Sequence, residues 1–328
     1  MAEIVLGIGT SHSPMLNTNP EIWPEHVKRD VRNGALWAWD GKTHTYDEMV
    51  EMTDPSIANE LTPEAWKAKH DANQHGIAEL GRILTEVNPD VIVAVGDDQK
   101  ELFHDDNMPT YLVYWGDTIW NKSRDFSDRT PPDIKLAAWG NHFDEPREFS
   151  AQSDLGLHII ETAMQNKFDV SHSRMMPNDQ GEGHAFGFVR RRLLDGKQIP
   201  IVPIVQNTFY PPNQPLPSRC FEFGESIREA IESWDSNARV AVLASGGLSH
   251  FVVDENLDRG VIKALEDHDH EHLKTLNTDL LNAGNSEIRN WITVAGMVQD
   301  KTMKLVEYVP CYRSPASTGG GWAFAYWD

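Results

Sequence analysis

Short hydrophobic runs alternate along the chain with amphipathic stretches. Five runs have the length and composition of buried strands; they lie at residues 4–8, 91–95, 111–115, 199–205 and 239–244. Apolar positions with helical spacing predict helices over residues 63–86, 155–167, 221–233, 259–281, 286–298 and 301–307. Strands that alternate with helices in this way predict a single-domain, three-layer α/β/α sandwich whose central sheet is mostly parallel or mixed.

Local signals refine the boundaries of these elements. Thr62 followed by Pro63 is typical of a helix start, and the sequence Asn88-Pro89 ends that helix. Residues 169–172 predict a short edge strand, and the alternation over residues 322–327 predicts a closing strand. Two segments, near 17–60 and 116–150, show little periodicity apart from a short helix near 47–52. We interpret them as insertions into one domain spanning residues 1–328, the first of which covers a pocket.

The amino-acid composition excludes several kinds of partner and site. Among the 328 residues, 29 are Lys or Arg and 50 are Asp or Glu, which gives a formal charge of −21. Nucleic acids and anionic membranes are poor partners for such a chain. The two cysteines, Cys220 and Cys311, are too few for a disulfide framework or a multi-cysteine metal site. The sequence shows no secretory signal and no apolar stretch of about 18 residues, so it predicts a cytoplasmic, soluble protein.

Three of the predicted strands are followed by small residues and then by polar groups. They are His12, the cluster Asp97-Asp98-Gln99, and His250. Because the carboxyl ends of parallel strands meet at one edge of a sheet, these groups are expected to converge there and to bind a metal or move protons. A fourth candidate, His184, follows glycines that let backbone approach a ligand closely. For His12 taken alone, capping a turn is an equally valid interpretation, and any one of these strand ends would mean little without the others.

Other histidines carry weaker signals. Residues 267–272 contain three histidines among acidic residues and are typical of a solvated helix face. His70 and His75 lie on a predicted helix, where packing or surface roles are expected. His104 is close to Gln99 in sequence and adjoins two aspartates, which makes it a candidate ligand.

Six short sequence motifs follow one another along the chain. They lie at residues 9–14, 96–103, 208–212, 219–228, 245–250 and 283–291. With these motifs the chain resembles the class III extradiol ring-cleaving dioxygenases. This family includes protocatechuate 4,5-dioxygenase catalytic subunits and gallate and 3-O-methylgallate dioxygenases. The resemblance implies a non-haem Fe(II) oxidoreductase that uses O₂ to cleave a catecholic acid of these types, in the breakdown of aromatic or lignin-derived compounds. It also implies a homodimer or larger homo-oligomer.

Enzymes of this family hold Fe(II) with two histidines and a carboxylate, and they leave positions open for substrate and O₂. By position, the resemblance makes His12 the first ligand and Glu287 the carboxylate. The second histidine position falls on Gln99, which is a neutral and weaker ligand. Three alternatives remain: Gln99 binds through its oxygen, another histidine such as His104 replaces it, or the site has lost its iron chemistry. We predict a working site with Gln99 at or beside the metal.

The resemblance also implies the catalytic groups. His250 would act as the acid/base residue, since its ordinary pKa of about 6.5 suits proton exchange near neutral pH. His184 would orient or protonate the substrate hydroxyls or oxygen. An anionic substrate also needs a local cation in this acidic chain. The candidates are Arg174, Lys100, Arg289 and residues 190–192.

Two other function classes remain open. A metal-dependent hydrolase on the same fold would use the same ligands to activate water. Zinc content with ester or amide turnover and no O₂ uptake would indicate this class. A non-catalytic aromatic-binding relative is the other class, with Gln99 marking a lost ligand. Such a protein would bind iron poorly but still bind a phenolic acid.

Overall fold

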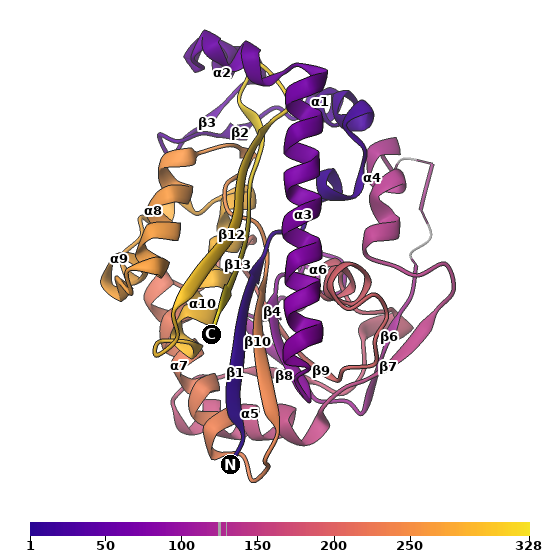
Figure 1. The fold of residues 1–328 in the computed structure, drawn as a ribbon, viewed down its shortest axis with the longest axis vertical. Coiled ribbons are helices and arrows are strands. Elements are labelled where there is room, and N and C mark those ends of the chain that lie inside the picture. The colour runs from indigo at the N-terminus through magenta and orange to yellow at the C-terminus, as the bar shows by residue number, and fades with distance from the viewer. Residues whose placement is uncertain (124–125, 129) are drawn as a thin grey trace.

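A mixed sheet forms the centre of the computed structural model, which describes residues 1–123, 126–128 and 130–328 (Figure 1). Along the sheet the strands are β11 (His250–Val252), β13 (Thr318–Trp327), β1 (Glu3–Thr10), β10 (Arg239–Ser245), β4 (Val91–Gly96), β9 (Ile201–Gln206), β5 (Tyr111–Tyr114) and β8 (Ser171–Ser173). Strands β1, β10, β4 and β9 are parallel neighbours. Strand β13 runs antiparallel to β1, and β12 (Met303–Tyr312) pairs with β13. The predicted mixed sheet is confirmed.

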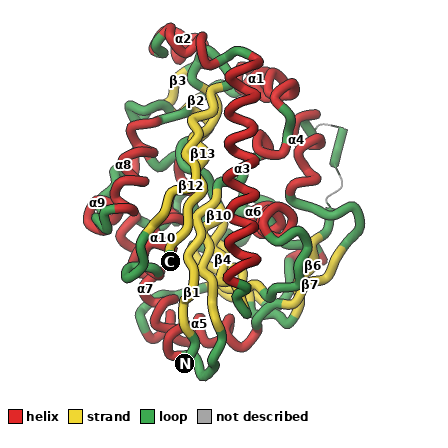
Figure 2. Tube along the Cα trace, viewed as in Figure 1, coloured by secondary structure: helices red, strands yellow, loops and turns green. Residues whose placement is uncertain are grey.

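Helices cover both faces of this sheet. Alternate residues of β4 point to opposite sides, so that Val93 joins one core cluster and Ile92 the other. The first cluster also contains residues of α5 (Ser153–Gln165), α7 (Pro217–Ser233), α8 (Glu255–Glu266) and α10 (Ile288–Met297). The second contains residues of α3 (Pro63–Val87) and α6 (His184–Phe188). Figure 2 distinguishes these helices from the strands between them, and the arrangement confirms the three-layer α/β/α sandwich.

Several predicted boundaries are confirmed closely. Helix α3 begins after Thr62, whose Oγ1 accepts a hydrogen bond of 3.1 Å from the Ala65 N–H. It ends at Asn88, which has a left-handed conformation with φ 46°. Strand β8 lies at the sheet edge, as the pattern over residues 169–172 predicts. Strand β13 includes the predicted closing strand and extends it towards the N-terminus.

Two helix predictions in the C-terminal third are wrong. Residues 303–307, within the stretch predicted as a helix over 301–307, belong to strand β12, because pairing with β13 along its length overrides the helical spacing. The helix expected over 259–281 is interrupted, and α9 (His270–Lys274) is separate from α8. The break lies at His268, which has φ 56°, and Asp269, whose side chain accepts from the His272 N–H at 3.0 Å and starts α9. Among the described residues, no helix is long and apolar enough to cross a membrane.

The two expected insertions contain regular structure. The first includes α1 (Trp23–Arg32), the hairpin of β2 (Leu36–Trp37) and β3 (Thr43–His44), and the predicted short helix α2 (Tyr46–Met52). The second includes the hairpin of β6 (Thr118–Asn121) and β7 (Arg147–Ser150), and α4 (Pro132–Ala137). Positions 124, 125 and 129 of this insertion lie outside the described residues. Residues of α1 line a cavity of about 660 Å³, which agrees with the prediction that the first insertion covers a pocket.

Close packing brings the start of α10 to the end of β1. Gly9 of β1 has no side chain, and a Cβ there would collide with the Trp291 ring of α10. Trp291 in turn donates from Nε1 to the Gly246 carbonyl at 2.8 Å, just after β10. These contacts place Glu287, the residue before α10, beside the ends of β1 and β10.

Candidate active site and metal centre

The carboxyl edge of the parallel strands gathers the residues predicted from sequence. His12 follows β1, Gln99 follows β4, and His250 begins β11 after the loop that leaves β10. His184 begins α6, and Glu287 precedes α10. All five line one cavity of about 660 Å³. The structure therefore brings these residues together, while their individual roles stay predictions.

His12 is held as a neutral imidazole whose Nε2 carries no proton. Its Nδ1 lies 3.0 Å from Ser245 Oγ, and that hydroxyl donates to the Ala185 carbonyl at 2.7 Å. Because the single hydroxyl proton is used there, Ser245 Oγ accepts from His12 Nδ1–H, and Nε2 keeps its lone pair. Burial lowers the pKa of His12 to about 3. This is the state in which a histidine binds a metal.

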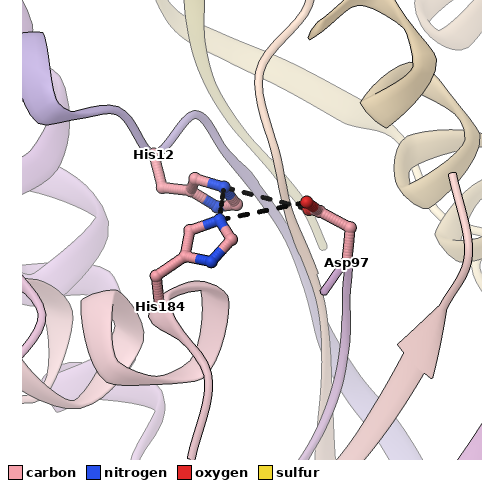
Figure 3. A group of neighbouring side chains, drawn as sticks. All are labelled: His12, Asp97 and His184. Atoms are coloured by element: carbon pink, nitrogen blue, oxygen red, sulfur yellow. Dashed lines mark hydrogen bonds and ion pairs between the residues drawn. The ribbon is translucent and has the colours of Figure 1, made fainter. Parts of the chain in front are cut away.

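His184 lies in direct contact with His12 at the cavity wall. The two Nε2 atoms are 2.9 Å apart, and the rings meet edge to face (Figure 3). His184 Nδ1 donates to Glu101 Oε2 at 2.8 Å, and the same oxygen accepts from the His184 backbone N–H. Burial alone would lower the pKa of His184, but the Glu101 charge and hydrogen bond raise it to about 10. A cation, either a proton or a metal ion, is thus favoured between the two rings.

Asp97 completes a cluster that suits a metal ion. Its Oδ1 lies 3.9 Å from His12 Nε2, and its Oδ2 lies 3.9 Å from His184 Nε2. The ligand atoms of these three residues all lie within 4.8 Å of one another (Figure 3). Asp97 Oδ2 is buried with no hydrogen-bond partner among the described residues, which is costly for a carboxylate. Burial, together with the nearby Glu287 charge, raises the pKa of Asp97. The donor set therefore fits a metal ion.

Glu287 is buried at the centre of a hydrogen-bond network. Its Oε1 accepts from Gln99 Nε2 at 3.0 Å and from His250 Nε2 at 3.1 Å. Its Oε2 accepts from the Gly247 N–H at 2.7 Å and lies 3.6 Å from His12 Nε2. Burial would raise the pKa of Glu287, but the charge of His250 and the hydrogen bonds from His250 and the Gly247 N–H lower it below its usual value. Glu287 is therefore an anion that three donors hold in a fixed orientation.

His250 is poised as a proton donor. Its Nδ1 lies 3.0 Å from the Leu248 carbonyl and its Nε2 3.1 Å from Glu287 Oε1, and both of these oxygens only accept. Both ring nitrogens therefore carry protons in this arrangement. Burial lowers the pKa of His250, but Glu287 and the Leu248 carbonyl raise it above its ordinary value. The ring also borders the cavity, so it can give a proton to a bound molecule.

Other sequence candidates lie elsewhere. His104 is exposed and does not line the cavity. Arg289 is buried and donates to backbone carbonyls, including those of Pro215 and Leu281. The remaining candidate cations, Arg174, Lys100 and residues 190–192, do not line the cavity either. The structure therefore supports none of the cations that the sequence analysis considered for an anionic substrate.

The cavity has other basic residues that the sequence analysis missed. Arg29 and Arg32 come from α1, and Arg313 comes from the turn between β12 and β13. A signal for the first two existed, because positions 29 and 32 are one helical turn apart on an amphipathic segment. Glu101 was also missed, although it lies within the conspicuous segment 96–103.

The family model described as the catalytic LigB subunit of aromatic ring-opening dioxygenase matches residues 54–320. The chain belongs to this family. The matched stretch contains Gln99, His184, His250 and Glu287, while His12 precedes it. The match confirms the resemblance found in the sequence.

Curated relatives are similar over shorter stretches. The chain is 34% identical to a gallate dioxygenase of Pseudomonas putida over 35% of this chain and 33% of that protein. It is 24% identical to a 2,3-dihydroxyphenylpropionate/2,3-dihydroxicinnamic acid 1,2-dioxygenase of Comamonas testosteroni over 53% of this chain and 47% of that protein. The chain thus spans about a third to a half of the length of these relatives.

Proposed function

We propose that this chain is a non-haem Fe(II)-dependent extradiol dioxygenase that cleaves the ring of a catecholic aromatic acid with O₂. One observation carries the proposal: a buried imidazole, a half-buried imidazole and a buried carboxylate converge on a small volume beside the cavity, in a chain of a ring-opening dioxygenase family. The substrate would be of the gallate, 3-O-methylgallate or protocatechuate type, from the breakdown of aromatic or lignin-derived compounds. O₂ would be the second substrate, with both of its atoms entering the product.

The metal would be held by His12 and Glu287, with Gln99 as the third residue predicted from sequence. When bound, iron would couple electron transfer from the catechol to O₂. The protein would contribute fixed ligand positions: Ser245 orients His12, and the Gly247 N–H orients Glu287. Two carboxylates, Asp97 and Glu287, would balance the charge of a divalent ion.

His250 would manage protons during the reaction. Its Nε2 donates to Glu287, and its other nitrogen is anchored on the Leu248 carbonyl. Because the ring borders the cavity and carries protons on both nitrogens, it would first give one proton to the bound molecule as an acid. The neutral ring would then take a proton from a phenolic hydroxyl as a base, which restores its starting state. The sequence prediction also places His184 near the substrate hydroxyls, and its position in the cavity supports contact with that region.

Basic residues in the cavity wall support an acidic substrate. Arg29, Arg32 and Arg313 line it, while Asp30 and Asp133 supply only two opposing carboxylates near them. The described residues give the Arg32 guanidinium one hydrogen bond, from Nε to the Lys28 carbonyl. The names of both relatives refer to aromatic acids. We therefore assign the substrate carboxylate to Arg32, assisted by Arg29.

One catalytic domain over residues 1–328 is part of the proposal. Strands β1 and β13, from opposite ends of the sequence, pair in the same sheet. His12 leaves one of these strands, and β11, which begins with His250, pairs with the other. The homo-oligomer and the cytoplasmic location stay predictions.

Oxygen uptake tests the proposed function. The full chain, loaded anaerobically with Fe(II), is offered 3-O-methylgallate, gallate, protocatechuate and 2,3-dihydroxyphenylpropionate in turn. We expect one substrate to consume O₂ stoichiometrically and give a new ring-opened chromophore, and we expect His12→Ala to abolish both. Zinc-dependent ester hydrolysis without O₂ uptake would instead indicate a hydrolase. Binding of a phenolic acid without any turnover would indicate a non-catalytic relative.

The role of Arg32 gives a specificity prediction. Arg32→Gln is expected to raise KM for the preferred catecholic acid about tenfold, since a charge-assisted hydrogen bond contributes about 1.5 kcal/mol. We expect kcat to change less than about twofold, because the contact is the same in substrate and transition state. Steady-state kinetics would be compared with 4-methylcatechol, which lacks the carboxylate and whose KM should not change.

Lys28→Gln is the matched control for Arg32→Gln. Lys28 lies on the same helix, carries the same charge and pairs with Glu25 outside the cavity lining. It should leave KM for both substrates unaltered. Equal KM changes for the two substrates, or in the two variants, would contradict a carboxylate contact at Arg32.

A further inference from the structure

Gln99 occupies the position where the resemblance expects a metal-binding histidine, but its side chain is used elsewhere. Its Nε2 donates to Glu287 Oε1 at 3.0 Å. With the amide reversed, the Gln99 oxygen would lie at that distance from a carboxylate oxygen, and two acceptors would repel each other. The amide nitrogen is a donor without a lone pair for a metal. In this arrangement the amide N–H of Gln99 donates to Glu287 and holds that carboxylate in place.

His184 has the features of a metal ligand that Gln99 lacks. Its Nδ1–H is directed to Glu101, so Nε2, which faces His12, is the nitrogen that can take up either a proton or a metal ion. A carboxylate behind the ring is the usual partner of a metal-binding histidine. Gly183 makes this pairing possible, because a Cβ at that position would already approach Glu101 Oε2 to 3.0 Å.

The distances match a shared ion. Two imidazole nitrogens at about 2.1 Å from a metal, at right angles, are about 3 Å apart. His12 Nε2 and His184 Nε2 are 2.9 Å apart. If both nitrogens carry lone pairs, this contact is repulsive unless a cation lies near both. The two oxygens of Asp97 are each 3.9 Å from one of these nitrogens, and one of them is the buried oxygen without a hydrogen-bond partner.

We propose that His184, rather than Gln99, is the second imidazole ligand of the metal in this chain. His12, His184 and Asp97 then form a set of two histidines and one carboxylate. Glu287 Oε2, 3.6 Å from His12 Nε2, borders this set and supplies a further carboxylate oxygen. Gln99 is a positioning residue that holds Glu287 together with His250. The inference rests on the proposed metal dependence, but it does not require ring cleavage.

Anaerobic metal titration of the full chain tests this assignment. Calorimetry with Fe(II) and Co(II) would compare wild type with His184→Ala and Gln99→Ala. We expect His184→Ala to raise the metal Kd at least 100-fold and Gln99→Ala to raise it less than about threefold. His104→Ala, which removes an exposed imidazole outside the cavity lining, is the control and should leave Kd unchanged. Circular dichroism of the metal-free variants checks that each is folded.

Proton NMR of the Co(II)-loaded protein reads the ligands directly. Both proposed histidines carry Nδ1–H, so wild type should show two exchangeable, strongly shifted imidazole N–H signals. Gln99→Ala should keep both signals, and His184→Ala should lose one. Loss of a signal or of affinity in Gln99→Ala, with neither lost in His184→Ala, would overturn the assignment. Two signals without O₂ uptake would reject the dioxygenase function but keep the ligand set.

Discussion

Replacing His250 with glutamine is expected to lower kcat about 10²- to 10⁴-fold, the usual contribution of a positioned acid/base group. A glutamine amide can still donate a hydrogen bond towards Glu287, so the carboxylate keeps a partner in place of His250 Nε2. It cannot accept a proton from a phenolic hydroxyl and return it. The loss should therefore lie in the chemical step rather than in metal binding.

Single-turnover O₂ consumption and metal affinity would be measured together for His250→Gln. The Fe(II) Kd should stay within about threefold of wild type. His26→Gln is a matched control, because His26 is buried, lines the same cavity and pairs with a carboxylate, Asp133, at 2.8 Å. A His250→Gln variant with wild-type kcat, or with a loss no larger than that of His26→Gln, would remove His250 from the acid/base role.

The strand ends show how far sequence could predict this site. His12 and the Asp97–Gln99 cluster each follow a buried apolar run, and parallel strands present such groups at one edge. The structure adds that His250 begins β11, which reaches the site through antiparallel pairing with β13. Sequence pattern predicted the proximity of these residues correctly, because strands and helices that alternate along the chain favour parallel strands, and this alternation can be recognised from local sequence.

The partners of these residues depend on tertiary packing, which local pattern does not encode. Glu101 fixes the ring of His184 across 83 positions of sequence. Tertiary packing also explains why Arg29 and Arg32 were missed. They lie in the cavity wall because α1 docks against the turn between β12 and β13, where Arg313 pairs with Asp30. Residues 301–307 were misread as a helix for a related reason, since pairing with β13 decides their conformation.

The second large effect is expected at the contact that docks α1. Arg313 donates from Nε and a terminal nitrogen to the two oxygens of Asp30, each at 2.7 Å, and Thr318 Oγ1 donates to the same carboxylate. Both charged side chains are about 95% buried. Arg313→Met should lower the free energy of unfolding by about 3–5 kcal/mol, because it leaves the Asp30 carboxylate buried without its counter-charge.

Chemical denaturation would measure this loss, with Arg228→Met as the control. Arg228 also contacts two carboxylates, Glu232 and Asp300, but at the surface, so its removal should cost less than about 1 kcal/mol. Equal losses of unfolding free energy in Arg313→Met and Arg228→Met would mean that burial of the Asp30–Arg313 pair does not make its disruption more destabilising.

The double variant Asp30→Leu/Arg313→Met separates pairing from packing. It removes both buried charges, so it should be markedly more stable than Arg313→Met alone. If the losses of unfolding free energy in the Asp30→Leu and Arg313→Met single variants simply add in the double variant, the residues are not coupled.

The double variant should also keep α1 docked through apolar contact. Since Arg29 and Arg32 lie on that helix, KM for the catecholic acid should then change less in the double variant than in Arg313→Met. The Asp30–Arg313 ion pair would thus stabilise the fold and also hold Arg29 and Arg32 in the part of the cavity wall that binds the substrate carboxylate.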